Sequence, residues 1–259
     1  PWTLFPDAEK NLSTSFRYAD SPPPASSKDR GLTCGLEALD RLLGELQPGW
    51  LTVLYGSKHC DELAHLLCVR AQLPHHEGGL GSHVVFIDGG NVFDPYLIAE
   101  AARRYGVHRE EALGRIHVSR AFTCYQLHSL ILEGVPEALH SFDPRLVVVS
   151  EVLRLYSESD LDRTEVRTMF NQAAYSLREL AEEHGVLVLA THRSKKRGYL
   201  GRLLLSRANV VARFEMMSGA VRLTLEGHPE KPRGFAGAES LLGSRHFLDE
   251  FLSGEVAVG

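Results

Sequence analysis

The sequence predicts an α/β protein in which helices flank a mostly parallel, doubly wound sheet. Short apolar runs of strand length recur along the chain, and longer stretches with helical periodicity connect them. The composition is that of an ordinary globular protein, with 44% hydrophobic and 24% charged residues. A chain of 259 residues is long enough for one sizeable core, so we expect one main domain.

The elements follow one another in an alternating order. Continuous apolar runs are typical of buried strands, and they occupy residues 50–55, 84–88, 115–119, 146–149 and 186–190. Apolar residues at helical spacing connect these runs over residues 61–72, 95–105, 126–139 and 160–184. Strands joined by crossover helices run parallel, which gives the predicted fold.

The chain ends differ from this pattern. Residues 209–214 and 221–225 alternate in polarity around Ser218-Gly219, which predicts an edge β-hairpin near the C-terminus. Apolar spacing over residues 238–259 predicts an amphipathic final helix. At the other end, the Pro/Ser-rich stretch 21–27 holds neither a helix nor a central strand. We therefore divide the chain into an N-terminal segment with a linker, 1–30, and a core domain, 31–259.

Composition excludes several classes of function. The net charge of -5 excludes a globally basic nucleic-acid binder, so any contact with phosphates needs a local basic patch. No apolar run approaches the ~18–20 residues that span a bilayer, and the first residues lack a basic and apolar leader. We expect a soluble protein of the cytoplasm, or of the nucleus in a eukaryote, without a membrane partner. The cysteines and histidines lack metal-ligand spacing, and no catalytic triad or carboxylate pair is persuasive, so we assign no metal and no catalytic residue.

In a doubly wound sheet, ligands bind where strands end and helices begin. The first such loop comprises Gly56, Ser57, Lys58, His59, Cys60, Asp61 and Glu62. Around it, the blocks 33–44, 72–74, 85–88 and 119–122 occur in an order and spacing that resemble the RecA/RadA recombinase family. The similarity is to the branch of archaeal RadA and the eukaryotic recombinase paralogues, over about residues 32–229. This resemblance implies a RecA-like fold.

The phosphate loop departs from the family. A working loop has the pattern GxxxxGK[ST], whose backbone N–H groups, lysine and hydroxyl hold the phosphates and magnesium. Counting back from residues 72–74 puts the glycine, lysine and threonine positions at His59, Cys60 and Asp61. Counting forward from Gly56 puts them at residues 61–63. Neither register supplies the pattern, and both place a carboxylate against a triphosphate. We expect Lys58 to be solvated.

Two further positions depart from what the resemblance implies. Where the family has a magnesium-orienting aspartate at the end of its fourth core strand, this chain has Ser150. Where it has a water-activating glutamate, the chain has Gly90. Asp88 is expected to cap its strand end, and alternation along the strand predicts that Glu151 points to the opposite face. We therefore predict a pseudo-ATPase that uses no cofactor.

A basic segment follows the last core strand, where the family has an Asn-Gln pair and mobile DNA-binding loops. No acidic residue lies between residues 193 and 207, and glycines at 198 and 201 favour mobility. A solvated charge run is the alternative interpretation. The position favours DNA binding, single- or double-stranded, by phosphate contacts and base stacking. The candidate residues are Arg193, Lys195, Lys196, Arg197, Tyr199, Arg202 and Arg207. The segment is shorter than the family's, which argues against strand exchange.

Before the linker, Phe16 and Ala19 are spaced as in the FxxA element by which these recombinases dock on the next protomer. The resemblance thus implies a homo-oligomer, or a hetero-complex with a RadA-type recombinase or paralogue. Packing of Phe16 on its own domain is the alternative.

Taken together, these residues indicate a non-hydrolysing accessory protein that binds DNA in homologous recombination and DNA repair. Three alternatives remain open at this point. The protein could be a scaffold of a recombinase complex without DNA affinity, a still-active DNA-dependent ATPase with a rearranged phosphate loop, or an enzyme of another class that reuses the cleft.

Overall fold

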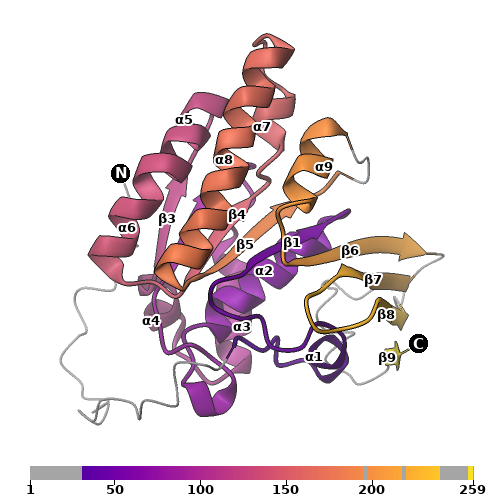
Figure 1. The fold of residues 1–259 in the computed structure, drawn as a ribbon. Helices are drawn as coiled ribbons and strands as arrows, with labels where there is room; N and C mark the ends of the chain where they lie inside the picture. The colour runs from indigo at the N-terminus through magenta and orange to yellow at the C-terminus, as the bar shows by residue number, and fades with distance from the viewer. Residues whose placement is uncertain (1–30, 195–197, 218–219, 240–255, 259) are drawn as a thin grey trace.

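The computed structural model describes residues 31–194, 198–217, 220–239 and 256–258 (Figure 1). Phe16, Ala19, Lys195, Lys196 and Arg197 lie outside the described residues. The predicted division between residues 1–30 and the core therefore stays a prediction. Among the described helices, none is both long and apolar enough to cross a membrane.

One sheet runs through the molecule in the order β3-β2-β4-β5-β1-β6-β7-β8-β9. The strands β1 to β6 are parallel, which confirms the predicted core. Their bounds are Leu51–Tyr55, Val84–Asp88, Ile116–Arg120, Leu146–Ser150, Leu187–His192 and Val210–Met217. Four central strands are buried along their whole length, because helices cover both of their faces.

Each face of the sheet has its own hydrophobic cluster. One face is covered by α1 (Glu37–Leu43), α2 (His59–Arg70), α3 (Pro95–Arg104) and α4 (Arg109–Gly114). The short helix η3 (His75–Glu77) lies between α2 and β2 in the sequence. The other face is covered by α5 (Cys124–Ser129), α6 (Val135–Phe142), α8 (Arg163–His184) and α9 (Tyr199–Leu205) (Figure 1). Alternate residues of β2 divide between them, with Phe86 in the first cluster and Ile87 in the second.

Local residues explain where several helices begin and end. The Asp94 side chain accepts from the Tyr96 N–H, and Pro95 occupies the first turn of α3. Asp162 caps α8 in the same way, and Gly185 ends it in the left-handed conformation. The predicted helix 126–139 consists of α5, the π-helical turn η4 (Leu130–Gly134) and α6. A short helix, α7 (Arg154–Ser157), follows β4.

The C-terminal part confirms the predicted hairpin and extends it. β6 pairs antiparallel with β7 (Ala220–Gly227), and β8 (Gly234–Glu239) and β9 (Val256–Val258) continue the sheet beyond it. The predicted helix over 238–259 is wrong at its two described ends, which are strand residues. The free edge of β7 supplies unpaired backbone groups that β8 satisfies, and this outweighs local helical spacing.

Candidate functional site

The parallel register brings the ends of the central strands to one edge of the sheet. Tyr55 lies opposite His192, and Asp88 lies opposite Ser150. The loops that follow these strands therefore meet, and they carry the phosphate-loop residues, Gly90, Glu151 and the start of the basic segment.

The turn after β1 requires glycine. Gly56 has a φ of +108°, and a Cβ there would lie 2.4 Å from the Phe214 carbonyl oxygen of β6. Its N–H donates to the His192 carbonyl at 3.0 Å. Glycine at this position is therefore explained by the close approach of β5 and β6, whether or not a phosphate binds. Helix α2 begins at His59, which is consistent with the register counted back from residues 72–74.

The first turn of α2 is acidic and buried. Asp61 is only 3% exposed, and both of its carboxylate oxygens accept hydrogen bonds. The Thr191 hydroxyl donates to Oδ1 at 2.6 Å, and Arg193 Nε donates to Oδ2 at 2.7 Å. Both donors come from the end of β5, so this buried carboxylate ties α2 to the strand beside β1.

Glu151 joins the same group, and the prediction that it points to the opposite face is wrong. Its backbone φ of +49° ends the strand alternation at Ser150. Glu151 Oε1 accepts from the Arg193 N–H at 2.8 Å and lies 3.7 Å from Arg193 Nε. The Glu151 N–H donates to the Thr191 hydroxyl oxygen at 3.2 Å. We call Asp61, Glu151, Thr191 and Arg193 the carboxylate–arginine cluster.

Burial raises the pKa of Glu151 from 4.5 to about 7, the nearby Asp61 carboxylate adds to the rise, and Arg193 opposes it. The neutral form of Glu151 is favoured because its carboxyl group is largely removed from water and lies near a second carboxylate. Glu151 can therefore carry a proton near neutral pH. The negative charge of the cluster is balanced by Arg193, a side chain of the same protein.

The remaining loop residues are also engaged. Lys58 is solvent-exposed, as predicted, and pairs with Glu62 at 3.1 Å. The Cys60 thiol donates to the Ser57 carbonyl at 2.8 Å, and burial raises its pKa well above the usual value. The Ser57 hydroxyl and His59 Nδ1 lie 2.8 Å apart. The lysine is thus held on the outer side of the helix start by a carboxylate one turn further on.

Asp88 caps its strand end, which confirms that prediction. Its carboxylate accepts from the N–H groups of Val92 at 2.9 Å and Phe93 at 3.1 Å, and from the Ser150 hydroxyl at 3.2 Å. Arg120 pairs with it at 3.2 Å. Next to this turn, a Cβ on Gly90 would lie 2.4 Å from Glu151 Cγ. Glu151 therefore occupies the space that a side chain at residue 90 would need.

The basic segment is only partly a loop. Arg193 turns inward to the carboxylate–arginine cluster, whereas residues 199–205 form α9, with Gly201 buried inside it. The expectation that Gly201 provides mobility is therefore wrong, because α9 packs on α8. Tyr199 is 49% exposed and lies under the Arg167 guanidinium of α8. Arg202 is exposed, and Arg207 donates to the Asn171 side chain at 2.6 Å.

Sequence reasoning missed Glu151, Thr191 and Arg167 as parts of these arrangements. Arg167 lies on α8, where one more arginine on a long helix gives no signal. Thr191 gave none either, although its position directly before the basic segment could have suggested a contact across the strand ends.

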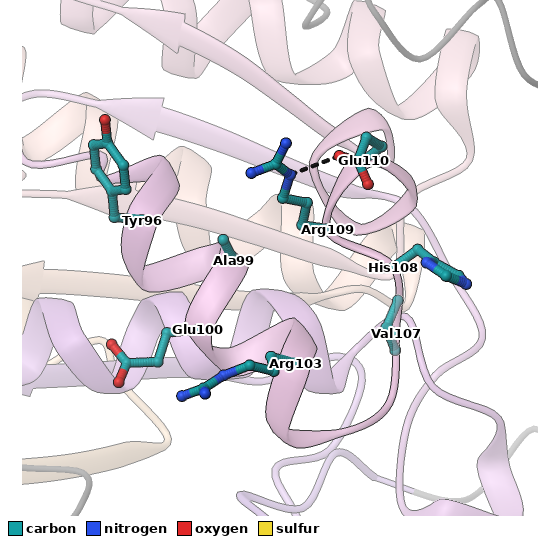
Figure 2. Close-up of a pocket in the computed structure, with 8 residues that line it drawn as sticks. All are labelled: Tyr96, Ala99, Glu100, Arg103, Val107, His108, Arg109 and Glu110. Atoms are coloured by element: carbon teal, nitrogen blue, oxygen red, sulfur yellow. Dashed lines mark hydrogen bonds and ion pairs between the residues drawn. The ribbon is translucent and has the colours of Figure 1, made fainter.

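A shallow hollow of about 670 Å³ lies between α3 and α4, away from the predicted site residues. Figure 2 shows that its side chains do not converge on one point. Arg109 pairs with Glu110 at 2.6 Å, and Tyr96 extends away from them. Converging polar groups are what fix a ligand in a pocket, so we assign this hollow no function. Within the described residues, no group of three or more potential metal ligands occurs.

The parallel core with its antiparallel C-terminal strands and its loops at one sheet edge defines a RecA-like α/β domain. A model of the family Rad51 matches residues 28–198 of this chain. Because this match covers well over half of the sequence, the chain belongs to the Rad51 family.

Curated relatives support this membership. A meiotic recombination protein DMC1 homolog A of Oryza sativa subsp. japonica is 33% identical over 191 residues, 71% of this chain and 55% of that protein. A DNA repair protein RAD51 homolog of Solanum lycopersicum is 30% identical over 167 residues, 62% and 48% of the two chains. The meiotic recombination protein DMC1 of Saccharomyces cerevisiae is 31% identical over 167 residues, which are 62% of this chain and 50% of that protein. The chain thus spans about half the length of these relatives.

Proposed function

We propose that this Rad51-family chain is a non-hydrolysing accessory protein that binds DNA in homologous recombination and DNA repair. The observation that carries the proposal is the carboxylate–arginine cluster, which joins the first turn of α2 to the ends of β4 and β5. Relatives named for DNA repair and meiotic recombination support the same setting. We place its activity in the cytoplasm, or in the nucleus of a eukaryote.

The residues at the strand ends do not fit a nucleoside triphosphate. A helix start that holds phosphate offers backbone N–H groups and a lysine, whereas the first turn of α2 offers Asp61 and Glu62. The guanidinium of Arg193, at the same edge of the sheet, already faces two carboxylates. Ser150 and Gly90 replace the groups that the family resemblance implies for magnesium and water. Phosphoryl transfer depends on positioning and charge neutralisation, so we infer that hydrolysis is lost.

DNA binding then rests on the basic segment, without control by a nucleotide. Arg202 is exposed on α9, and Lys195, Lys196 and Arg197 precede it in sequence. Contacts between such side chains and phosphates release counterions, so affinity falls with salt. Docking through Phe16 and Ala19 would place the protein beside a copy of itself or a recombinase. The N-terminal segment would thus act as the docking arm, and residues 31–259 as the DNA-binding core.

The test is a set of DNA-binding isotherms at several salt concentrations, with and without magnesium and ATP. We expect an affinity that falls steeply with salt and ignores nucleotide. Reversing Lys195, Lys196 and Arg197 to Glu should lower affinity by more than roughly tenfold. The matched control reverses Arg41, Arg109 and Arg233, which are exposed elsewhere, so that net charge changes equally.

Three outcomes would point elsewhere. Equal losses in both triple variants would mean that only net charge matters, and no binding at low salt would favour a protein-interaction scaffold. An affinity that depends on nucleotide would favour an ATPase.

One observation favours the ATPase as a second candidate. Glu151 fills the space beside Gly90, close to where the resemblance implies a water-activating glutamate. If Glu151 has taken over that role, the wild-type chain will hydrolyse ATP with magnesium, and Glu151→Gln will abolish turnover. We expect no turnover in either protein.

A further inference from the structure

A cationic and aromatic surface lies along the contact between α8 and α9. The Arg167 guanidinium carbon lies 4.6 Å from the centre of the Tyr199 ring, across the two helices. Arg167 is exposed and Tyr199 is 49% exposed, so solvent reaches this stacked pair. A guanidinium over a ring combines positive charge with a flat aromatic group, and both kinds of group stack with further flat groups.

A second arginine continues this surface. Arg207 Nη2 donates to Asn171 Oδ1 at 2.6 Å. Asn171 lies one helical turn beyond Arg167, so both positions share a side of α8. Because Asn171 is neutral, this hydrogen bond orients the Arg207 guanidinium without neutralising it.

These two arginines differ from two others that are paired with carboxylates. Arg154 pairs with Glu158, and Arg178 pairs with Glu182. Across the described ranges, no carboxylate forms an ion pair with Arg167 or Arg207 at the α8–α9 contact. One uncompensated guanidinium lies over a half-exposed ring, and a second is held one helical turn further along α8. Together they favour a ligand that is both anionic and flat.

We propose that Arg167, Asn171, Tyr199 and Arg207 form a binding surface for single-stranded DNA, with Arg167 as a contact outside the basic segment. This inference rests on the DNA binding proposed above and deepens it. A base stacks on the Arg167–Tyr199 pair while neighbouring phosphates contact the guanidinium groups. Single strands are favoured because a duplex buries the faces of its bases.

The same surface assigns different tasks to the arginines of the segment. Arg193 faces the carboxylate–arginine cluster, so it positions the chain that leads to α9. Arg207 and Tyr199 face outward with Arg167. The DNA-contacting set therefore gains a residue from α8 and loses Arg193.

The test is fluorescence anisotropy of a labelled oligothymidylate titrated with the full chain at several salt concentrations. We expect Arg167→Ala to lower affinity roughly tenfold and to reduce the salt slope by about 0.7, the value for one phosphate contact on a single strand. Tyr199→Ala should lower affinity and leave the salt slope unchanged, because stacking releases no counterion. Arg109→Ala, which removes an exposed charge on α4, is the control and should bind like wild type. Thermal unfolding by circular dichroism checks that each variant is folded.

The possible failures are distinguishable. If wild type binds and Arg167→Ala binds equally well, this inference is wrong and the proposed function stands. If wild type itself does not bind at low salt, both are wrong. Equal losses against a duplex of the same length would overturn the stacking assignment, and so would equally effective competition by polyglutamate, which has charge without bases.

Discussion

Arg193 Nε donates to Asp61 Oδ2 at 2.7 Å, and this contact joins the end of β5 to the first turn of α2 across 132 residues of sequence. Asp61 is buried, whereas the Arg193 side chain is 47% exposed. The pair therefore lies at the boundary between the core and the loop edge. Removing Arg193 would leave the buried Asp61 carboxylate without its cationic partner.

The first prediction concerns the strength of this contact. We expect Asp61→Asn to lower the free energy of unfolding by about 2 kcal/mol, because the Asn amide would face the Arg193 guanidinium and leave it with Glu151 alone. Urea unfolding measures this. Glu110→Gln, which breaks an exposed pair with Arg109, should leave the transition midpoint unchanged. Similar midpoints for the two variants would show that the buried pair contributes nothing.

The second prediction concerns pH. Burial raises the pKa of Glu151 to about 7, so between pH 4.5 and 7 the folded chain holds a proton that the unfolded chain releases. The contribution of Glu151 to stability is therefore present at low pH and lost as pH rises through 7. Relative to Glu151→Gln, which does not titrate, wild type should lose up to about 3 kcal/mol between pH 4 and 9.

Unfolding of the two proteins across this pH range gives the comparison. The difference between them isolates residue 151, since all other groups titrate in both. A difference that stays constant with pH would contradict the shifted pKa.

The third prediction concerns the turn after β1. Gly56→Ala should lower the free energy of unfolding by at least about 2 kcal/mol, because the new Cβ meets the Phe214 carbonyl and the backbone is left-handed. Gly81→Ala shares the positive φ but meets nothing within 4 Å, so it should cost about 1 kcal/mol. Equal losses of unfolding free energy in the two variants would mean that β6 moves away from the new Cβ without an energetic penalty.

The fourth prediction concerns docking. Phe16→Ala should abolish self-association of the chain, or its capture by a purified Rad51-family recombinase, because the docking interface loses its aromatic anchor. Phe5→Ala, in the same N-terminal segment, is the control. Sedimentation velocity measures self-association, and a pull-down measures capture by the recombinase. If both variants assemble like wild type, Phe16 packs on its own domain.

The parallel core was predictable because its strands are continuous apolar runs that both helical layers cover. The segment 234–239 gave no such signal, since its glycines and alanines join the sheet through backbone pairing with β7. Helix α9 was missed because a run of basic residues with two glycines resembles a loop until α8 packs against it.

The candidate site was predictable in composition and not in geometry. The lack of a phosphate-loop pattern around Asp61 is visible in the letters of the sequence. That Asp61 pairs with Arg193 is not, because the contact depends on β1 and β5 lying side by side. Glu151 was placed on the wrong face because strand alternation was extended one residue past the point where the backbone turns left-handed.

The Arg193–Asp61 contact is intramolecular, so dilution or a change in metabolite level does not alter the effective concentration of its two groups. The concentration of a cation that arrives with a diffusing ligand varies with the energy state of the cell. The Arg193 guanidinium, in contrast, is present whenever the chain is folded. On the function proposed here, the time at which such a protein acts on DNA would be set by its abundance and by the neighbours it meets.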